Sequence, residues 1–210
     1  MNGFYGECLR LEIFGQSHAE SVGMTLEGVP AGARVDLDAL LRFMQRRAPG
    51  RSEYATARRE ADVPEFTSGL CGGEADGTPI TAVIRNTDVR PRDYDALRTV
   101  PRPGHADYSA WLRYGSIPTG GGEFSGRMTA PLCIAGGICM QLLEHEGVHI
   151  RARILSIGNV TDSAPFDAPV ADKSFPAVSD SAAAAMQAEI AQAKADGDSV
   201  GGVVECVVEG

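Results

Sequence analysis

Four groups of residues in this sequence of 210 residues carry side chains suited to acid–base chemistry or anion binding. The first is His18 in the segment GQSHAESVG, with Ser17 before it and Ser21 close behind it. An imidazole titrates near neutral pH, which makes His18 a candidate general acid. The alternative is a loop histidine that only hydrogen-bonds to the backbone, and spacing alone favours that alternative.

The second group is a cluster of arginines in QRRAPGRS and the ARRE that follows it. The cluster comprises Arg46, Arg47, Arg51, Arg58 and Arg59. Guanidinium groups match the oxygens of phosphates and carboxylates in a bidentate way. A cationic helix C-terminus would explain Arg46 and Arg47 but not the other three. Anion binding is therefore the favoured interpretation.

The third group lies in VPRPGHADYSAWLRYG, residues 100–115. Its prolines and glycine predict a rigid turn, rather than a helix, around His105. Asp107 is close enough in sequence to favour the charged form of that imidazole. The neighbouring aromatic side chains suit a flat ligand. A packed loop with surface charges explains the same pattern equally well.

The fourth group is TGGGEFSGRMTA, residues 119–130, directly before a long apolar segment. Backbone N–H groups of a glycine loop at a helix N-terminus form an anion site. Arg127 has the wrong charge for that end of a helix. A bound anion explains its position better than a flexible connection capped by Ser125 does. No metal site is predicted, because the histidines form neither HExxH nor HxxEH.

The elements that must position these residues follow from apolar periodicity and capping signals. Strands and helices mix without strict alternation, and this predicts an α+β fold rather than a doubly wound parallel sheet. Asp36 and Ser179 or Asp180 are the predicted helix N-caps. The predicted strands are 8–14, 22–29, 80–86, 148–157 and 200–209, and the predicted helices are 37–47, 128–145 and 180–195.

Composition limits the class of protein. Hydrophobic residues make up 43% of the chain, and the net charge of −9 follows from 19 basic and 28 acidic residues. Residues 1–210 are expected to form a single domain with its own core. The acidic balance disfavours a nucleic-acid partner. No apolar run suits a membrane span, and the N-terminus is unlike a signal peptide. The five unpatterned cysteines indicate a reducing, cytoplasmic location.

The chain resembles the chorismate synthase family from about residue 6 to residue 210. Five motifs carry the resemblance, in the order of that family: RRAPGRS at 46–52, RPGHADY at 102–108, RYG at 113–115, GGGEFSGRMTAP at 120–131 and GDSVGGVVE at 197–205. The form of the glycine motif resembles the variant found in anaerobic bacteria.

The resemblance implies an enzyme that converts 5-enolpyruvylshikimate 3-phosphate to chorismate by trans-1,4-elimination of phosphate. Such enzymes require reduced FMN without net redox change. The implied fold is a layered β-α-β sandwich, with antiparallel sheets around buried helices, and the implied assembly is a homotetramer.

The resemblance also assigns roles to residues. His18 would protonate the departing phosphate, and His105 would handle a proton at the flavin edge. Arg47 also matches a position tied to NADPH in members that reduce their own flavin. The substrate's phosphate and carboxylates would be held by Arg46, Arg47, Arg51 and Arg127, and FMN would contact Glu123, Phe124 and Ser125.

Some residues depart from the family pattern. The segment GQSHA replaces the usual GESHG, so Gln16 and Ala19 differ, and Glu53 and Glu123 stand where basic residues are usual. Family members continue beyond residue 210, so the chain is expected to be the N-terminal portion of a longer enzyme. The alternative is a non-catalytic truncated relative that binds a full-length partner. A third interpretation is a phosphate-ester-binding protein with no flavin dependence.

Overall fold

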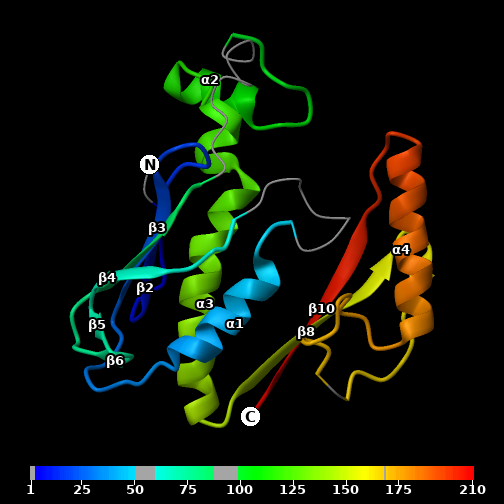
Figure 1. The fold of residues 1–210 in the computed structure, drawn as a ribbon. Helices are drawn as coiled ribbons and strands as arrows, with labels where there is room; N and C mark the ends of the chain where they lie inside the picture. The colour runs from blue at the N-terminus through cyan, green and yellow to red at the C-terminus, as the bar shows by residue number, and fades with distance from the viewer. Residues whose placement is uncertain (1–2, 51–59, 88–98, 168) are drawn as a thin grey trace. The chain divides into compact units, whose positions relative to one another are not determined.

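The computed structural model describes residues 3–50, 60–87, 99–167 and 169–210. Arg51, Glu53, Arg58 and Arg59 lie outside these ranges. The chain divides into two compact units, Met1–Leu142 and Leu143–Gly210. Within the described ranges, every pair of neighbouring strands is antiparallel. Helices accompany these sheets in each unit, so the predicted α+β class is confirmed (Figure 1).

The first unit is built on a five-stranded sheet with the order β1-β2-β3-β7-β4. Its strands are β1 (Gly3–Tyr5), β2 (Arg10–Gly15), β3 (Ser21–Glu27), β7 (Ile80–Arg85) and β4 (Glu65–Ser68). A small hairpin pairs β5 (Leu70–Cys71) with β6 (Glu74–Ala75). The predicted strands 8–14, 22–29 and 80–86 are confirmed. The sequence did not indicate β4, β5 or β6, which are too short to show alternation.

Two helices, α1 (Leu37–Arg47) and α3 (Thr129–His145), pack against this sheet. Asp36 is the N-cap of α1 and accepts a hydrogen bond of 2.9 Å from the N–H of Ala39, as predicted. A Cβ on Gly137 would lie 2.5 Å from Leu40 Cδ1, so the missing side chain lets α3 approach α1 closely. The shared core contains alternate residues of β3 and β7 and the inner faces of both helices: Val22, Met24, Leu26, Ile80, Ala82, Ile84, Leu40, Met44, Ile134 and Ile138.

Along the chain before α3, the described residues 99–128 form one helix and two short 3₁₀ segments. These are α2 (Asp107–Tyr114), η2 (Thr119–Phe124) and η3 (Gly126–Met128). The sequence had predicted a turn at His105, and α2 begins two residues after it. Arg127 lies in η3, just before α3 instead of within its first turn.

The second unit contains β8 (His149–Ile157), β9 (Val160–Thr161), β10 (Gly202–Glu209) and α4 (Asp180–Ala195). The sheet order is β10-β8-β9. Ser179 caps α4 by accepting from the N–H of Ala182, which confirms the predicted cap. No helix within the described ranges is both long and apolar enough to cross a membrane.

Candidate active site

Three consecutive glycines form the surface against which both candidate histidines lie. Gly120, Gly121 and Gly122 have φ values of 64°, 95° and 53°, in the region that disfavours other residues. A Cβ on Gly120 would lie 2.3 Å from Nδ1 and Cε1 of His18. A Cβ on Gly121 would lie 3.0 Å from Nε2 of His105. The absent side chains therefore let both imidazole rings reach the same loop.

His18 sits in a tight turn that follows β2. The N–H of Ala19 donates to the carbonyl of Gln16 over 3.2 Å and closes this turn. The buried Ser17 hydroxyl lies 3.0 Å from His18 Nδ1 and donates to the carbonyl of Gly120 over 3.3 Å. A hydroxyl that donates to Gly120 accepts from Nδ1–H, so this pair fixes a proton of His18 at Nδ1.

His105 is oriented by a buried carboxylate. Its Nδ1 lies 2.7 Å from Oδ1 of Asp107, whose side chain is fully buried. Arg102 donates to the same carboxylate from Nε over 2.7 Å and from Nη2 over 2.9 Å. The hydrogen bonds from the Arg102 side chain and backbone, together with the charges of Arg102 and His105, hold the pKa of Asp107 well below its usual range despite burial. The ionised carboxylate accepts from Nδ1–H and directs Nε2 of His105 toward Gly121.

A buried carboxylate joins two of the candidate arginines. Asp62 accepts from Nη1 of Arg47 with one oxygen and from Nη1 of Arg127 with the other. Arg47 also donates from Nη2 to the carbonyl of Gly126 over 3.3 Å and from Nε to Thr129 Oγ1 over 3.4 Å. Because two guanidinium groups share one carboxylate, this cluster carries one excess positive charge. Asp62 has a φ of 51°, a backbone conformation that is costly away from glycine.

Arg127 has an unused donor in this cluster. Its side chain is 2% exposed, and its Nε donates to Oδ1 of Asn86 over 3.0 Å. Its Nη2 is buried without a hydrogen-bond partner among the described residues. An unsatisfied buried donor costs about 1–3 kcal/mol, and more when it is charged. A bound anion would accept from this nitrogen, so the arrangement suits anion binding.

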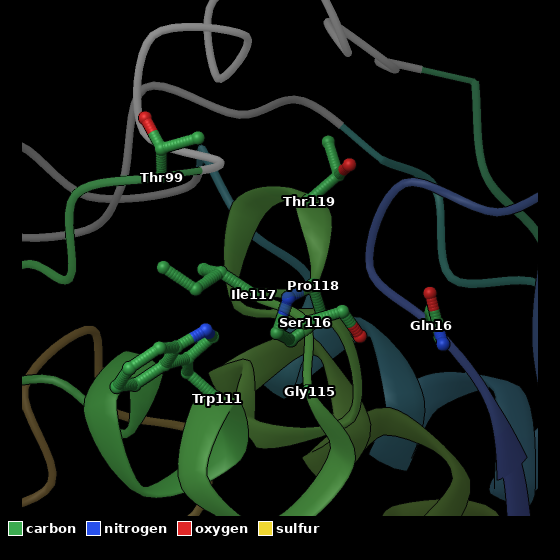
Figure 2. A pocket seen from close by; sticks show the side chains of 8 residues that line it. All are labelled: Gln16, Thr99, Trp111, Gly115, Ser116, Ile117, Pro118 and Thr119. Atoms are coloured by element: carbon green, nitrogen blue, oxygen red, sulfur yellow. The ribbon is translucent and has the colours of Figure 1, made fainter.

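A cavity of about 650 Å³ adjoins the glycine loop (Figure 2). Its volume is in the range of small-molecule sites. Figure 2 shows the Trp111 and Ile117 side chains on one side and Gln16, from the turn that carries His18, on the other. The cavity is lined by Gln16, Thr99, Trp111, Gly115, Ser116, Ile117, Pro118 and Thr119.

Comparison with known proteins identifies the family. The family model described as chorismate synthase matches residues 9–210. The chain belongs to the chorismate synthase family. It is 41% identical to a chorismate synthase of Lancefieldella parvula, over 100% of this chain and 60% of that protein. It is 41% identical to one of Porphyromonas gingivalis (97% and 57%) and 39% identical to one of Thermococcus kodakarensis (96% and 57%).

The fold comparison agrees with this family. A crystal structure of chorismate synthase superposes with a TM-score of 0.71 at 24% identity, over 96% of this chain and 57% of that one. This likeness confirms the predicted chorismate synthase type of fold. The chain spans 57–60% of the length of the three relatives named above.

The structure gathers some of the residues that the chorismate synthase resemblance singled out. His18 and His105 share the glycine loop, and Arg47 and Arg127 share Asp62. Arg46 is exposed, and its guanidinium carbon lies 5.7 Å from the centre of the Phe43 ring. Arg51 is outside the described residues. The predicted roles of these arginines in chorismate synthase chemistry therefore rest most directly on Arg127 and Arg47.

The segment predicted to contact FMN follows the glycines directly. Phe124 is 42% exposed, and its ring stacks on Tyr114 with 6.4 Å between ring centres. Ser125 accepts from the N–H of Arg127 over 3.2 Å and so stabilises η3. Glu123 is half-buried. The exposed ring of Phe124 suits a flat ligand, whereas the carboxylate of Glu123 does not suit a phosphate.

Sequence reasoning missed two residues that organise this site. Asp62 lies two residues after the ARRE segment, and an acidic residue close to an arginine cluster was the available signal. Asn86 ends the predicted strand 80–86, and nothing in its local sequence marks it. Both act through contacts with residues far along the chain, to Arg127 in each case.

Proposed function

We propose that this chain carries the chorismate synthase site that converts 5-enolpyruvylshikimate 3-phosphate to chorismate by trans-1,4-elimination of phosphate. Family membership supports the lyase class of this reaction. The observation that carries the proposal is the approach of His18 and His105 to adjacent glycines of one loop. The reaction breaks a C–O and a C–H bond, and two imidazole groups at one loop suit the two proton movements.

The arginine cluster would bind the phosphate and stabilise it as it leaves. Arg127 offers Nη2, which is buried and without a partner among the described side chains. Asp62 fixes Arg127 and Arg47 by one carboxylate, so neither guanidinium has to reorganise as charge develops. Preorganised donors in a site with little water are worth more than the same donors in solution. His18 would donate its Nε2 proton to the departing phosphate.

His105 would hold a proton at Nε2, beside Gly121. Asp107 Oδ1 lies 2.7 Å from the opposite ring nitrogen, Nδ1. Arg102 in turn holds Asp107 through two side-chain hydrogen bonds of 2.7 and 2.9 Å. The ring is therefore prevented from turning, and its free nitrogen keeps one direction during proton transfer.

The residues near the loop fit a flat cofactor. The Phe124 ring is 42% exposed and stacked on Tyr114, and its exposed part suits contact with a planar ring. We propose that Phe124 and Ser125 contact reduced FMN, and that Arg47 binds NADPH where NADPH reduces the flavin. When bound, reduced FMN supplies electron density transiently, which no side chain does. We further propose that the protein assembles as a homotetramer and acts in the cytoplasm.

Two other functions are distinguished by simple observations. A non-catalytic relative would bind a full-length partner and form no product. A phosphate-ester-binding protein would bind phosphorylated ligands equally well with and without FMN. The carboxylate of Glu123 is the feature that most favours these alternatives, because it is unfavourable beside a flavin phosphate.

The test is chorismate formation by the purified chain. The assay runs without oxygen, with 5-enolpyruvylshikimate 3-phosphate and chemically reduced FMN. We expect product over many turnovers, and a rate lower by about 100-fold or more in His18→Gln and in His105→Gln, as expected for loss of an acid–base group. His149→Gln is the matched control, because His149 is exposed in β8.

The outcomes separate the candidates. Turnover that survives both site substitutions would remove the histidines from the mechanism. No product from a folded chain that binds the substrate would overturn the proposed activity of this chain and favour the non-catalytic relative.

A further inference from the structure

One side-chain amide connects the turn that carries His18 with the arginine cluster. Asn86 donates from Nδ2 to the carbonyl of Gln16 over 3.1 Å and to the carbonyl of Ala19 over 2.8 Å. Its Oδ1 accepts from Nε of Arg127 over 3.0 Å. Its backbone N–H donates to the carbonyl of Glu20 over 2.9 Å. Asn86 therefore contacts both ends of the tight turn and the buried guanidinium.

The chemistry of the partners fixes the orientation of this amide. A guanidinium group only donates hydrogen bonds, and a backbone carbonyl only accepts them. The oxygen of Asn86 must therefore face Arg127, and its nitrogen must face the turn. Reversing the amide would lose the hydrogen bonds to Gln16, Ala19 and Arg127 at once.

The sheet places Asn86 at this position. It follows β7 directly, and Arg85 at the end of β7 pairs with Ser21 at the start of β3. Asn86 therefore lies beside the residues that precede β3, which are those of the His18 turn. On its other side, Asp62 accepts from Nη1 of Arg127, so that the guanidinium is held at two nitrogens while Nη2 stays available.

We propose that Asn86 is a positioning residue that holds the His18 turn in register with the Arg127 guanidinium. This inference rests on the proposed function, in which His18 protonates the phosphate that Arg127 binds. A proton donor and an anion site on separate loops need a fixed separation, because a displacement of about 1 Å slows catalysis markedly. Asn86 supplies that constraint through side-chain hydrogen bonds to both loops.

The test measures whether an anion bound at Arg127 changes the NMR signal of the His18 ring. It does not require catalytic turnover. Sulfate is the probe, because it is a tetrahedral dianion whose charge is constant near neutral pH. The chain has four histidines, so labelling each ring with ¹³C at Cε1 gives at most four ring signals in the NMR spectrum. The signal of His18 is the one that is missing in His18→Gln. Sulfate is titrated at one fixed pH into the wild-type chain, into Asn86→Leu and into Asn159→Leu. Asn159 is the control, since it is exposed in the turn between β8 and β9.

In the wild type and in Asn159→Leu, we expect saturating sulfate to shift the His18 signal. In Asn86→Leu, sulfate should still bind, within about tenfold of the wild-type dissociation constant, since Asp62 still holds Arg127. The His18 signal should lose most of its response, whereas the His149 signal should be the same in all three chains. A purely structural role would lower stability without separating binding from the His18 response.

Three results would overturn the proposal. The first is a full His18 response in Asn86→Leu. The second is complete loss of sulfate binding in a folded Asn86→Leu chain, which would make Asn86 part of the anion site. The third is a wild-type chain in which sulfate does not move the His18 signal. If Asn86→Leu does not fold, Asn86→Ser is smaller, stays polar and takes its place. Failure of the elimination reaction itself would appear only in the turnover assay.

Discussion

The imidazole rings of His18 and His105 lie against neighbouring glycines, although the two histidines are 87 positions apart in the sequence (105 − 18). His18 faces Gly120, and His105 faces Gly121. Each ring also has a polar partner at Nδ1, which is Ser17 Oγ at 3.0 Å for His18 and Asp107 Oδ1 at 2.7 Å for His105. The glycine loop is therefore the element that brings two separately positioned rings to one place.

Gly120→Ala should displace His18 while costing little more stability than the backbone strain alone. Its φ of 64° costs an alanine about 1–2 kcal/mol, and the new Cβ would overlap the His18 ring at 2.3 Å. The ring can turn away, so the expected effects are a moved His18 ring signal in NMR and slower turnover.

Gly32→Ala is the control for Gly120→Ala. Gly32 has a φ of 81°, and a Cβ there would meet nothing within 4 Å. Urea unfolding should show similar losses of stability in the two variants, and only Gly120→Ala should move the His18 signal. A His18 signal that is unmoved in Gly120→Ala would contradict the contact with the loop.

Asp107→Asn should destabilise the chain at neutral pH, by an amount that shrinks in acid. Hydrogen bonds from Arg102 depress the pKa of Asp107 in the folded state, so its ionised form stabilises the fold above the unfolded value of about 3.9. That contribution falls away as pH drops below this value toward the lower folded pKa. Urea unfolding followed through Trp111, the single tryptophan, measures the difference between wild type and variant at each pH.

The same series with Asp172→Asn provides the comparison for Asp107. Asp172 is an exposed loop residue, and its replacement should change stability little at any pH. A difference between wild type and Asp107→Asn that stayed constant from neutral pH to strong acid would mean that the carboxylate charge is not what stabilises this region.

Helices α1, α3 and α4 and the longer strands were predictable because each carries a capping signal or an apolar pattern within its own sequence. Asp36 and Ser179 cap α1 and α4, and apolar alternation marks β3 and β8. The sequence did not predict helix α2, because the prolines and glycine before it indicate a turn. The structure contains both the turn and the helix. The strands of two to four residues had no periodicity to detect.

The site was predictable in its residue types but not in its connections. Arg47 and Arg127 stood out by charge, yet the carboxylate that joins them lies 15 residues from one and 65 from the other. Asn86 carries no charge and has ordinary neighbours in sequence. Contacts of this kind depend on how β7 and η3 meet in the fold, which no local pattern encodes.

Asp62→Asn should destabilise the first unit strongly. The substitution leaves two guanidinium groups without their shared counter-charge, and removing one member of a buried ion pair costs about 3–5 kcal/mol. Glu65→Gln is the control, since the Arg85–Glu65 pair is about half exposed and should contribute less than about 1 kcal/mol. Urea unfolding followed by Trp111 fluorescence compares them, and equal losses in the two variants would show that Asp62 does not hold the arginines together.

Arg127→Lys should weaken binding of the phosphorylated substrate although it keeps the positive charge beside Asp62. A lysine has a single ammonium group in place of the planar guanidinium, so it cannot donate hydrogen bonds to Asp62, Asn86 and an anion in the same geometry. Losing a hydrogen bond to a charged group costs about 1.5–3 kcal/mol, which corresponds to about 10- to 150-fold in affinity. Calorimetric titration with 5-enolpyruvylshikimate 3-phosphate measures this change. Arg34→Lys, at a side chain 82% exposed, should bind as the wild type does. An unchanged affinity in Arg127→Lys would mean that its buried Nη2 does not contact the phosphate.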